Sequence, residues 1–501
     1  MKILFLAGML AASLCSPVFA ADKPAENTKT EVPELTSFVT KHKGKFNGKT
    51  VSYTATVSNM HLTNKEGDVT GDAVTTSYVA ESDENRPVTF VFNGGPGSSS
   101  VWLHMGIFGP KYVEVPSDAQ DAGNAPYKIL HNPLSPLDKT DLVFIDPIGT
   151  GFSQLAGEGT AKDFWSIAAD AESVSAVVKQ WIAKNNRWNS AKFIAGESYG
   201  TTRAAAMLPY LNDRKSPLRI NGLILISQAL DYAGSTPEAD NMISFVTYLP
   251  TMAATAWYHG KIDKNSISLE KLVEDAKAFA TDEYLPALFK GSALPAAEFD
   301  KIAAKLAYFT GLNETLIKRG NLRVDATRQR KLLLADQGIA LGRSDSRYTI
   351  DEIDDLDITP KHDASSTGVS GAYNAALRHY LMNDLKVTWD RDYLVSNRDV
   401  GRNWVYYRDS GREPHTVNTS ADLAEGMRVN PSMKVMLASG YYDYATPLFD
   451  GDYTFGRYGI DNSRVIKHNY EAGHMMYLHK PDMEKLAKDI SAFYDDMKGN
   501  P

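Results

Sequence analysis

The sequence predicts an α/β fold with a mostly parallel central sheet and one long helical insertion. Short apolar runs, which are typical of buried parallel strands, alternate with helical segments in the first part of the chain. Residues 235–413 then contain amphipathic helical segments and no run of that kind, and strands resume after them. We therefore expect one α/β domain built from residues 36–234 and 414–501, into which residues 235–413 are inserted.

The predicted strands change in pattern along the chain. The first two alternate apolar and polar residues, which indicates an antiparallel hairpin or meander at the start of the domain. The later ones are compact apolar runs. In chain order the predicted strands are Thr50–Val57, Ala73–Ala80, Pro87–Asn93, Asp141–Asp146, Lys192–Ala195, Leu223–Ile226, Lys434–Ala438 and Arg464–Tyr470.

Helices are predicted from apolar residues that recur at helical spacing. Such a stripe runs between Lys162 and Lys184, and a second helix, at about Gly200–Leu211, follows a glycine-rich turn. The insertion shows amphipathic helices at Ser268–Ala280 and Ala296–Phe309. A helix near Pro481–Met497 closes the chain.

Composition excludes several classes of protein. Hydrophobic residues make up 43% of the 501 residues, which is too many for a disordered chain. Lys and Arg number 53 and Asp and Glu 61, so the formal net charge is −8. An acidic chain offers no electrostatic footprint for nucleic acid or anionic lipid, and we expect neither as a partner. The number of subunits is left open by the sequence.

The first twenty residues have the features of a secretory signal peptide. Lys2 provides a positive start, Ile3 to Cys15 form a short apolar core, and we expect cleavage after Ala20. An uncleaved anchor is the alternative. Residues 21–35 then form a flexible leader, and after cleavage we expect no membrane-spanning segment and a periplasmic or secreted protein. Cys15 is the only cysteine, so the mature chain would have no disulfide and no thiolate ligand for a metal.

A candidate nucleophile lies between a predicted strand and a predicted helix. Residues 196–200 read Gly-Glu-Ser-Tyr-Gly, and a serine on a sharp strand-to-helix turn projects its hydroxyl away from the sheet. The pattern alone also fits an ordinary glycine-rich turn, so the strand and helix around Ser198 carry the prediction.

A serine nucleophile needs a base and a carboxylate that orients the base. In this architecture both follow later strands, in the order Ser, Asp, His. Asp443 comes directly after the predicted strand 434–438, and His474 follows the strand 464–470. His479 is the nearest alternative base, but it lies closer to the closing helix.

Acyl transfer also needs backbone donors for the oxyanion. One is expected to be the N–H of Tyr199, and the other should come from the loop Asn93-Gly94-Gly95-Pro96-Gly97, where glycine allows a close approach to substrate. Glycine-rich loops also bind phosphate, but neither phosphate-loop pattern follows this strand.

Four motifs together resemble the serine carboxypeptidase family. They are residues 93–100 (NGGPGSSS), 146–153 (DPIGTGFS), 196–200 (GESYG) and 472–475 (AGHM), in family order. The resemblance implies an α/β-hydrolase fold, no metal and no cofactor, peptide substrates shortened from the C-terminus, and a cap at the place of the insertion. We expect such a cap to cover Ser198 and set selectivity.

The resemblance also implies roles for single residues. Ser198 resembles the nucleophile, His474 the base and Asp443 its partner, and Gly95 and Tyr199 resemble the oxyanion donors. The remaining matched positions bind the terminal carboxylate of the substrate; they are Asn93, Gly94 and Glu197.

Two positions depart from the family pattern. Ile107 stands where the family commonly has a second Glu, and Ser98 stands where it has a Cys, so a disulfide that tethers the cap is not expected. We interpret the chain as an exported serine carboxypeptidase. The alternatives are an aminopeptidase, esterase or acyltransferase of the same fold, and a catalytically silent binding protein.

Overall fold

The computed structural model describes residues 30–82, 85–238, 240–406, 417–457 and 459–498. The predicted signal peptide and residues 21–29 of the predicted leader lie outside these ranges. The rest of that leader lies along the sheet, where Thr30 pairs with Gly157 through two backbone hydrogen bonds and the carbonyl of Glu34 accepts one from Asn59 Nδ2.

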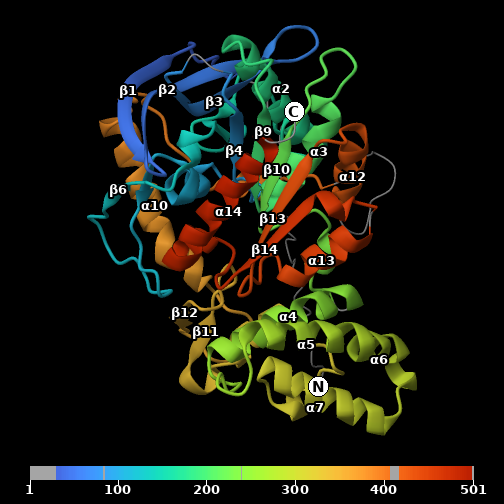
Figure 1. The fold of residues 1–501 in the computed structure, drawn as a ribbon. Helices are drawn as coiled ribbons and strands as arrows, with labels where there is room; N and C mark the ends of the chain where they lie inside the picture. Colours follow the sequence, from blue (N-terminus) through green and yellow to red (C-terminus); the bar gives the residue numbers. More distant parts are fainter. Residues whose placement is uncertain (1–29, 83–84, 239, 407–416, 458, 499–501) are drawn as a thin grey trace, which may run out of the picture.

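A ten-stranded sheet forms the centre of the described chain (Figure 1). Its order is β1-β2-β3-β7-β4-β9-β10-β13-β14, with β8 paired to β3. In this spatial order the six neighbouring strands β7, β4, β9, β10, β13 and β14 run parallel. Strands β1, β2 and β3 form an antiparallel meander at one edge. The bounds are β1 Ser37–Phe46, β2 Lys49–Thr63, β3 Val69–Ala80, β4 Val88–Phe92, β7 Asp141–Asp146, β8 Gln154–Leu155, β9 Lys192–Glu197, β10 Gly222–Ile226, β13 Lys434–Gly440 and β14 Val465–Tyr470.

This topology, with a serine turn after β9, is that of an α/β-hydrolase, and the predicted fold class is confirmed. All eight predicted strands lie within or overlap observed ones. Strand β1 was not predicted, because its residues alternate between exposed and half-exposed positions up to the buried Phe46 and include three lysines. Among the described strands it pairs with β2 alone, at the edge of the sheet.

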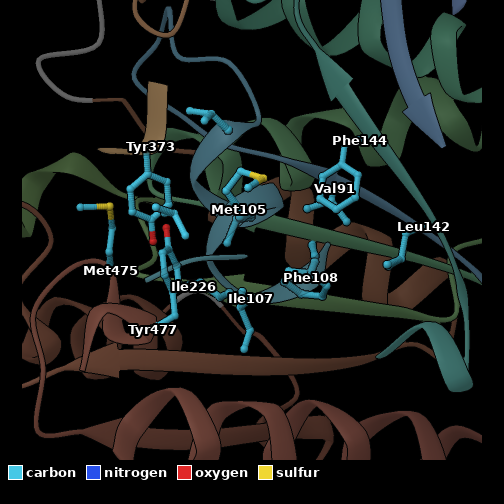
Figure 2. Close-up of a cluster of buried hydrophobic side chains, with 14 of the residues drawn as sticks. Val91, Met105, Ile107, Phe108, Leu142, Phe144, Ile226, Tyr373, Met475 and Tyr477 are labelled. Atoms are coloured by element: carbon cyan, nitrogen blue, oxygen red, sulfur yellow. The ribbon is translucent and has the colours of Figure 1, made fainter. Parts of the chain in front are cut away.

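Helices cover both faces of the sheet and create two cores. Successive residues of one strand point to opposite faces: Phe90 of β4 packs in the core beneath α2, α3 and α12, whereas Val91 packs with α10 and α14. Figure 2 shows Val91 and Phe144 in the second core. The helices of these layers are α1 Val101–Leu103, α2 Ile167–Lys184, α3 Tyr199–Leu211, α10 Ala364–Asn383, α11 Arg398–Arg402, α12 Ser420–Val429, α13 Leu448–Arg457 and α14 Lys480–Lys498.

The first part of the insertion forms a helical lobe at one end of the sheet (Figure 1). The lobe has its own core, which includes Leu249, Phe279 and Leu306. Its helices are α4 Met242–Tyr258, α5 Leu269–Phe279, α6 Leu285–Lys290, α7 Ala296–Thr310, α8 Glu314–Arg319 and α9 Ala326–Leu332. The predicted helices at 268–280 and 296–309 are confirmed as α5 and α7.

The second part of the insertion packs back on the α/β domain. A short hairpin, β11 Ile339–Leu341 and β12 Thr349–Asp351, leads into α10, and α10 buries Tyr373 and Leu377 in the core shared with the sheet. Two further short strands, β5 Lys111–Val113 and β6 Ile129–His131, pair beside the π-helical turn His104–Phe108. Within the described ranges, no helix is both long and apolar enough to span a membrane.

Candidate active site

Ser198 occupies a strained turn between β9 and α3. Its backbone angles, φ 60° and ψ −131°, lie outside the conformations that residues other than glycine ordinarily adopt. A Cβ on Gly196 would lie 2.5 Å from the carbonyl oxygen of Gly200, so the turn closes only with glycine at that position. Ser198 is half-buried between buried neighbours.

The structure brings Asp443 and His474 together at the ends of β13 and β14. His474 Nδ1 lies 2.7 Å from Asp443 Oδ2. The carboxylate also accepts hydrogen bonds from Ala445 N, Thr446 N and Thr446 Oγ1 at 2.7–3.0 Å. Because donors surround Asp443, we assign the hydrogen of His474 to Nδ1, which leaves Nε2 free to accept a proton. His479 instead pairs with Asp482 in the first turn of α14.

Ser227 connects the serine turn to the histidine loop. The N–H of Ser198 donates to the carbonyl of Ile226, the last residue of β10, at 3.0 Å. The next residue, Ser227, is buried with φ 51° and donates from its hydroxyl to the carbonyl of His474 at 2.7 Å. The end of β10 thus fixes Ser198 and His474 relative to each other.

The glycine loop passes directly over the start of α3. A Cβ on Gly94 would overlap the backbone nitrogen of Tyr199 and lie 2.8 Å from that of Gly200. Gly95 follows with φ 104°, and the N–H of Ser98 closes the turn on the carbonyl of Gly94 at 3.1 Å. The backbone of this loop and the positive end of the α3 dipole therefore face the same small space beside Ser198.

Glu197 is a buried carboxyl group next to Ser198. Its Oε1 accepts a hydrogen bond from Asn93 Nδ2 and its Oε2 one from the hydroxyl of Tyr477, both at 2.8 Å. The N–H of Leu103 donates to Asn93 Oδ1 at 3.0 Å, which turns the amide nitrogen toward Glu197. Both carboxyl oxygens are thus held by uncharged donors.

Burial shifts the protonation of this cluster. It raises the pKa of Glu197 to about 7, against the lowering effects of His474, Tyr477 and Asn93. Burial lowers the pKa of His474, but the Asp443 and Glu197 carboxylates outweigh it and the pKa lies above its ordinary 6.5. Glu197 and His474 therefore influence each other's protonation.

A buried ion pair anchors the serine helix to the glycine loop. Arg203 of α3 is 1% exposed and donates to Asp170 of α2 at 2.7 Å and to the carbonyl of Asn93 at 2.7 Å. The hydroxyl of Tyr199 donates to the same Asp170 at 3.1 Å. These contacts hold Asn93 and Tyr199 at fixed positions on either side of the turn.

The 146–153 motif supports the glycine loop from below. Asp146 accepts hydrogen bonds from the N–H and hydroxyl of Ser100, both at 2.8 Å, at the start of α1.

Residues 394–397 of the insertion cross both loops and form a segment that we call the strap. Within the strap, Leu394 pairs with Gly151 through two backbone bonds, and the N–H of Asn397 donates to the carbonyl of Gly97 at 2.8 Å.

A second segment of the insertion, residues 343–347, braces the loops of Asp443 and His474. The carbonyl of Arg343 accepts from the N–H of Tyr444, and the N–H of Ser346 donates to the carbonyl of Tyr442, both at 3.0 Å. On the other side Asp345 accepts from the N–H of Gly473 at 3.1 Å. Residues 343–347, which we call the brace, therefore contact both the loop of Asp443 and the loop of His474.

The chain resembles known proteins over the region that carries most of this site. A family model described as serine carboxypeptidase matches residues 76–454, which include Ser198 and Asp443 and end before His474. The chain belongs to the serine carboxypeptidase family. Among curated members, serine carboxypeptidase-like 26 of Arabidopsis thaliana is 28% identical over 186 residues, which is 35% of this chain and 39% of that protein. Serine carboxypeptidase-like 34 of the same plant is 27% identical over 220 residues, 41% of this chain and 40% of that protein.

Both matches span about two fifths of the serine carboxypeptidase relatives' own length. Among solved structures, the peroxisomal alpha-beta-hydrolase Lpx1 of Saccharomyces cerevisiae is 9% identical, with a TM-score of 0.34 over 92% of this chain and 89% of that one. A haloalkane dehalogenase loop variant of Bradyrhizobium elkanii is 12% identical, with a TM-score of 0.31 over 92% and 98% of the two chains. Family membership supports a hydrolase of the peptidase class.

Sequence reasoning on the serine carboxypeptidase motifs missed several residues that shape the site. The described ranges contain no group of three or more His, Cys, Asp or Glu side chains that could hold a metal ion. The missed residues are Asp170, Arg203, Ser227, Asp345 and Tyr477. Arg203 and Tyr477 lie two or three residues after a quoted motif, and the others lie far from the motifs along the chain.

Proposed function

We propose that this protein is a serine-type carboxypeptidase that removes C-terminal residues from peptides. The observation that carries the proposal is the buried carboxyl of Glu197, which adjoins Ser198 and is held by Asn93. A simple esterase has no need of a carboxyl group with a pKa of about 7 at this position. A protonated carboxyl can donate a hydrogen bond to the terminal carboxylate of a peptide.

The proposed reaction proceeds through an acyl-enzyme. Ser198 Oγ attacks the carbonyl carbon of the last peptide bond while His474 Nε2 takes the hydroxyl proton. The N–H groups of Gly95 and Tyr199 stabilise the oxyanion of the tetrahedral intermediate. The C–N bond then breaks, His474 gives its proton to the departing amine, and water hydrolyses the ester by the same steps. Asp443 stabilises the imidazolium throughout.

Carboxylate recognition distinguishes this reaction from its alternatives. In the proposed reaction Asn93, the N–H of Gly94 and protonated Glu197 bind the terminal carboxylate of the substrate. An aminopeptidase would recognise an ammonium group, for which this set of donors is unsuitable. An acyltransferase would share the acyl-enzyme and differ in the nucleophile that removes the acyl group.

We further propose that the chain is exported to the periplasm or the medium, on the strength of residues 1–20. N-terminal sequencing of the protein from its natural source should begin at Ala21. A mature chain that begins at Met1 would contradict the proposal.

Mass spectrometry of a defined peptide set tests the activity directly. Each peptide is supplied free, acetylated at the N-terminus and amidated at the C-terminus. We expect free and acetylated peptides to shorten from the C-terminus and amidated ones to react far more slowly, with Ser198→Ala as the inactive control. Shortening from the N-terminus, or products in which an added alcohol captures the acyl group without hydrolysis, would replace the proposal with an aminopeptidase or an acyltransferase.

A further inference from the structure

Tyr477 completes the hydrogen bonding of Glu197. Its hydroxyl donates to Oε2 at 2.8 Å, and Asn93 Nδ2 donates to Oε1 at the same distance. The three side chains are between 1% and 4% exposed. Each oxygen of the carboxyl group therefore has one fixed donor, and the plane of the group is set by two residues from opposite sides.

The ring of Tyr477 reaches this position because residue 106 is glycine. A Cβ on Gly106 would overlap Cδ2 and Cε2 of the ring and lie 3.2 Å from the hydroxyl of Tyr373. Figure 2 shows the hydroxyl ends of Tyr373 and Tyr477 directed toward each other, with Met475 beside them. The neighbouring Ile107 is 1% exposed in the core and provides no polar group.

We propose that Tyr477 is a positioning residue for the free C-terminal carboxylate of the substrate. Its hydroxyl holds Glu197 in the orientation that meets the substrate, at a site where Ile107 supplies no second carboxyl group. The proposal rests on the proposed carboxypeptidase function and adds to it a residue and a fit between Gly106 and Tyr477.

The phenol of Tyr477 differs from a second carboxyl group in its ionisation, and this difference can be measured. Burial raises the pKa of Tyr477 well above its ordinary value, and the charge of Glu197 raises it further, so the hydroxyl remains a neutral donor over the working pH range. The other ionisable groups that face Glu197 are His474 and Asp443, with Tyr373 behind Tyr477. Among the described groups named here, Glu197 is then the acid whose ionisation controls carboxylate binding.

The test compares Tyr477→Phe with Tyr373→Phe, which removes a neighbouring hydroxyl while the two described hydrogen bonds of Glu197 stay in place. Each variant and the wild type are assayed on one blocked dipeptide as the free acid and as the C-terminal amide. Below the pKa of Glu197 we expect Tyr477→Phe to raise KM for the free acid about fivefold, the effect of one lost hydrogen bond between neutral groups, and to leave kcat/KM for the amide within about twofold. In the profile of kcat/KM against pH for the free acid, the alkaline decline of Tyr477→Phe should move to higher pH, because the ionised Glu197 carboxylate has lost a hydrogen-bond donor. Tyr373→Phe should match the wild type.

A second pair of variants tests the fit with Gly106 and controls for folding. Gly106→Ala should weaken free-acid binding by displacing the Tyr477 ring, whereas Gly106→Ala combined with Tyr477→Ala should be no worse than Tyr477→Ala alone. If Tyr477→Phe leaves both KM and the alkaline limb unchanged while Glu197→Gln still alters them, the role of Tyr477 is wrong and the carboxypeptidase proposal stands. If neither variant changes the difference between acid and amide, the proposed function itself fails.

Discussion

The carbonyl oxygen of Ser344 accepts a hydrogen bond from the backbone N–H of His474 at 2.6 Å. A residue from within the insertion therefore holds the loop of the candidate base. The same segment continues through Asp345, which binds the N–H of Gly473, to Arg347, which pairs with Asp345 at 2.7 Å and donates to the carbonyl of Glu471 at 3.0 Å. The position of the imidazole thus depends on chain more than a hundred residues away.

Replacing Asp345 with Ala should destabilise the protein and impair turnover together. The change leaves the buried guanidinium of Arg347 without its partner, and breaking one side of a buried ion pair costs about 3–5 kcal/mol. Denaturant unfolding measures the loss. Lys271→Ala, which removes an exposed pair with Asp275, is the matched control and should leave the midpoint nearly unchanged. Equal effects of the two variants would contradict the brace.

Ser198 should be the residue that a fluorophosphonate probe labels. Ser198→Ala and His474→Ala should each reduce kcat by about six orders of magnitude, and Asp443→Asn by about four, because the members of a triad act as a unit. Intact-mass and peptide mapping identify the labelled residue. Ser463→Ala, at an exposed serine, should label normally. Labelling that survives in Ser198→Ala would remove Ser198 as the nucleophile.

Gly94→Ala should damage the oxyanion site specifically. The added methyl group would overlap the nitrogen of Tyr199, so the backbone must shift where the intermediate binds. Loss of an oxyanion donor lowers kcat about 10²–10³-fold. Gly456→Ala, at an exposed helical glycine with open space around it, serves as the control and should keep full activity. A Gly94→Ala enzyme with wild-type kcat would exclude this loop from catalysis.

Turnover of free-acid peptides should decline as the pH rises through about 7. The pKa of Glu197 is raised to about 7 by burial, and above it the ionised group repels the substrate carboxylate. Amide-capped substrates carry no such charge and should lack the decline, and Glu197→Gln should remove it for the free acid. The profile of kcat/KM against pH for both substrates measures this effect. If the profiles of the wild type and Glu197→Gln superimpose for both substrates, Glu197 does not bind the substrate carboxylate.

Arg343→Gln should move the acid limb of the profile of kcat/KM against pH to higher pH. Burial lowers the pKa of His474, Asp443 and Glu197 raise it, and the exposed Arg343 charge opposes the carboxylates. Without Arg343 the imidazole keeps its proton to higher pH, and less of it is available as the base. The amide-capped substrate isolates this limb from Glu197 recognition. The shift should shrink at high salt, and a limb that does not move at low salt would show that the two charges do not interact.

The positions of the main site residues could be predicted because local patterns specify them. Glycine spacing around Ser198 and the strand ends before Asp443 and His474 are features of short stretches, and the parallel sheet brings those ends together. The contacts of Tyr477, Asp345 and the strap join segments separated by more than a hundred residues, and no periodicity in a single stretch encodes them.

The elements that were not predicted also have physical causes. Helix α4 is apolar on nearly all sides because it is buried in the lobe, so no amphipathic stripe marks it. Helix α10 begins in a run of small polar residues that shows no apolar stripe, and its Val369, Tyr373 and Leu377 are buried against the α/β domain. In both cases tertiary packing, and not local preference, determines the helix.

The strap at residues 394–397 has a consequence for how this chain can diverge. Because it ties Gly97 and Gly151 together, the inserted region cannot be exchanged for that of a relative as one cassette without loosening the loops beside Ser198. The exchangeable unit is smaller, from α4 to α9, whose helices share most of one core. A graft of that unit must still fit Tyr441, Tyr442 and Tyr444 of the host, which pack against α4 and α5. A graft limited to that unit should inherit the donor's helices and keep the host's chemistry, whereas one that extends through residue 405 should transplant part of the catalytic framework.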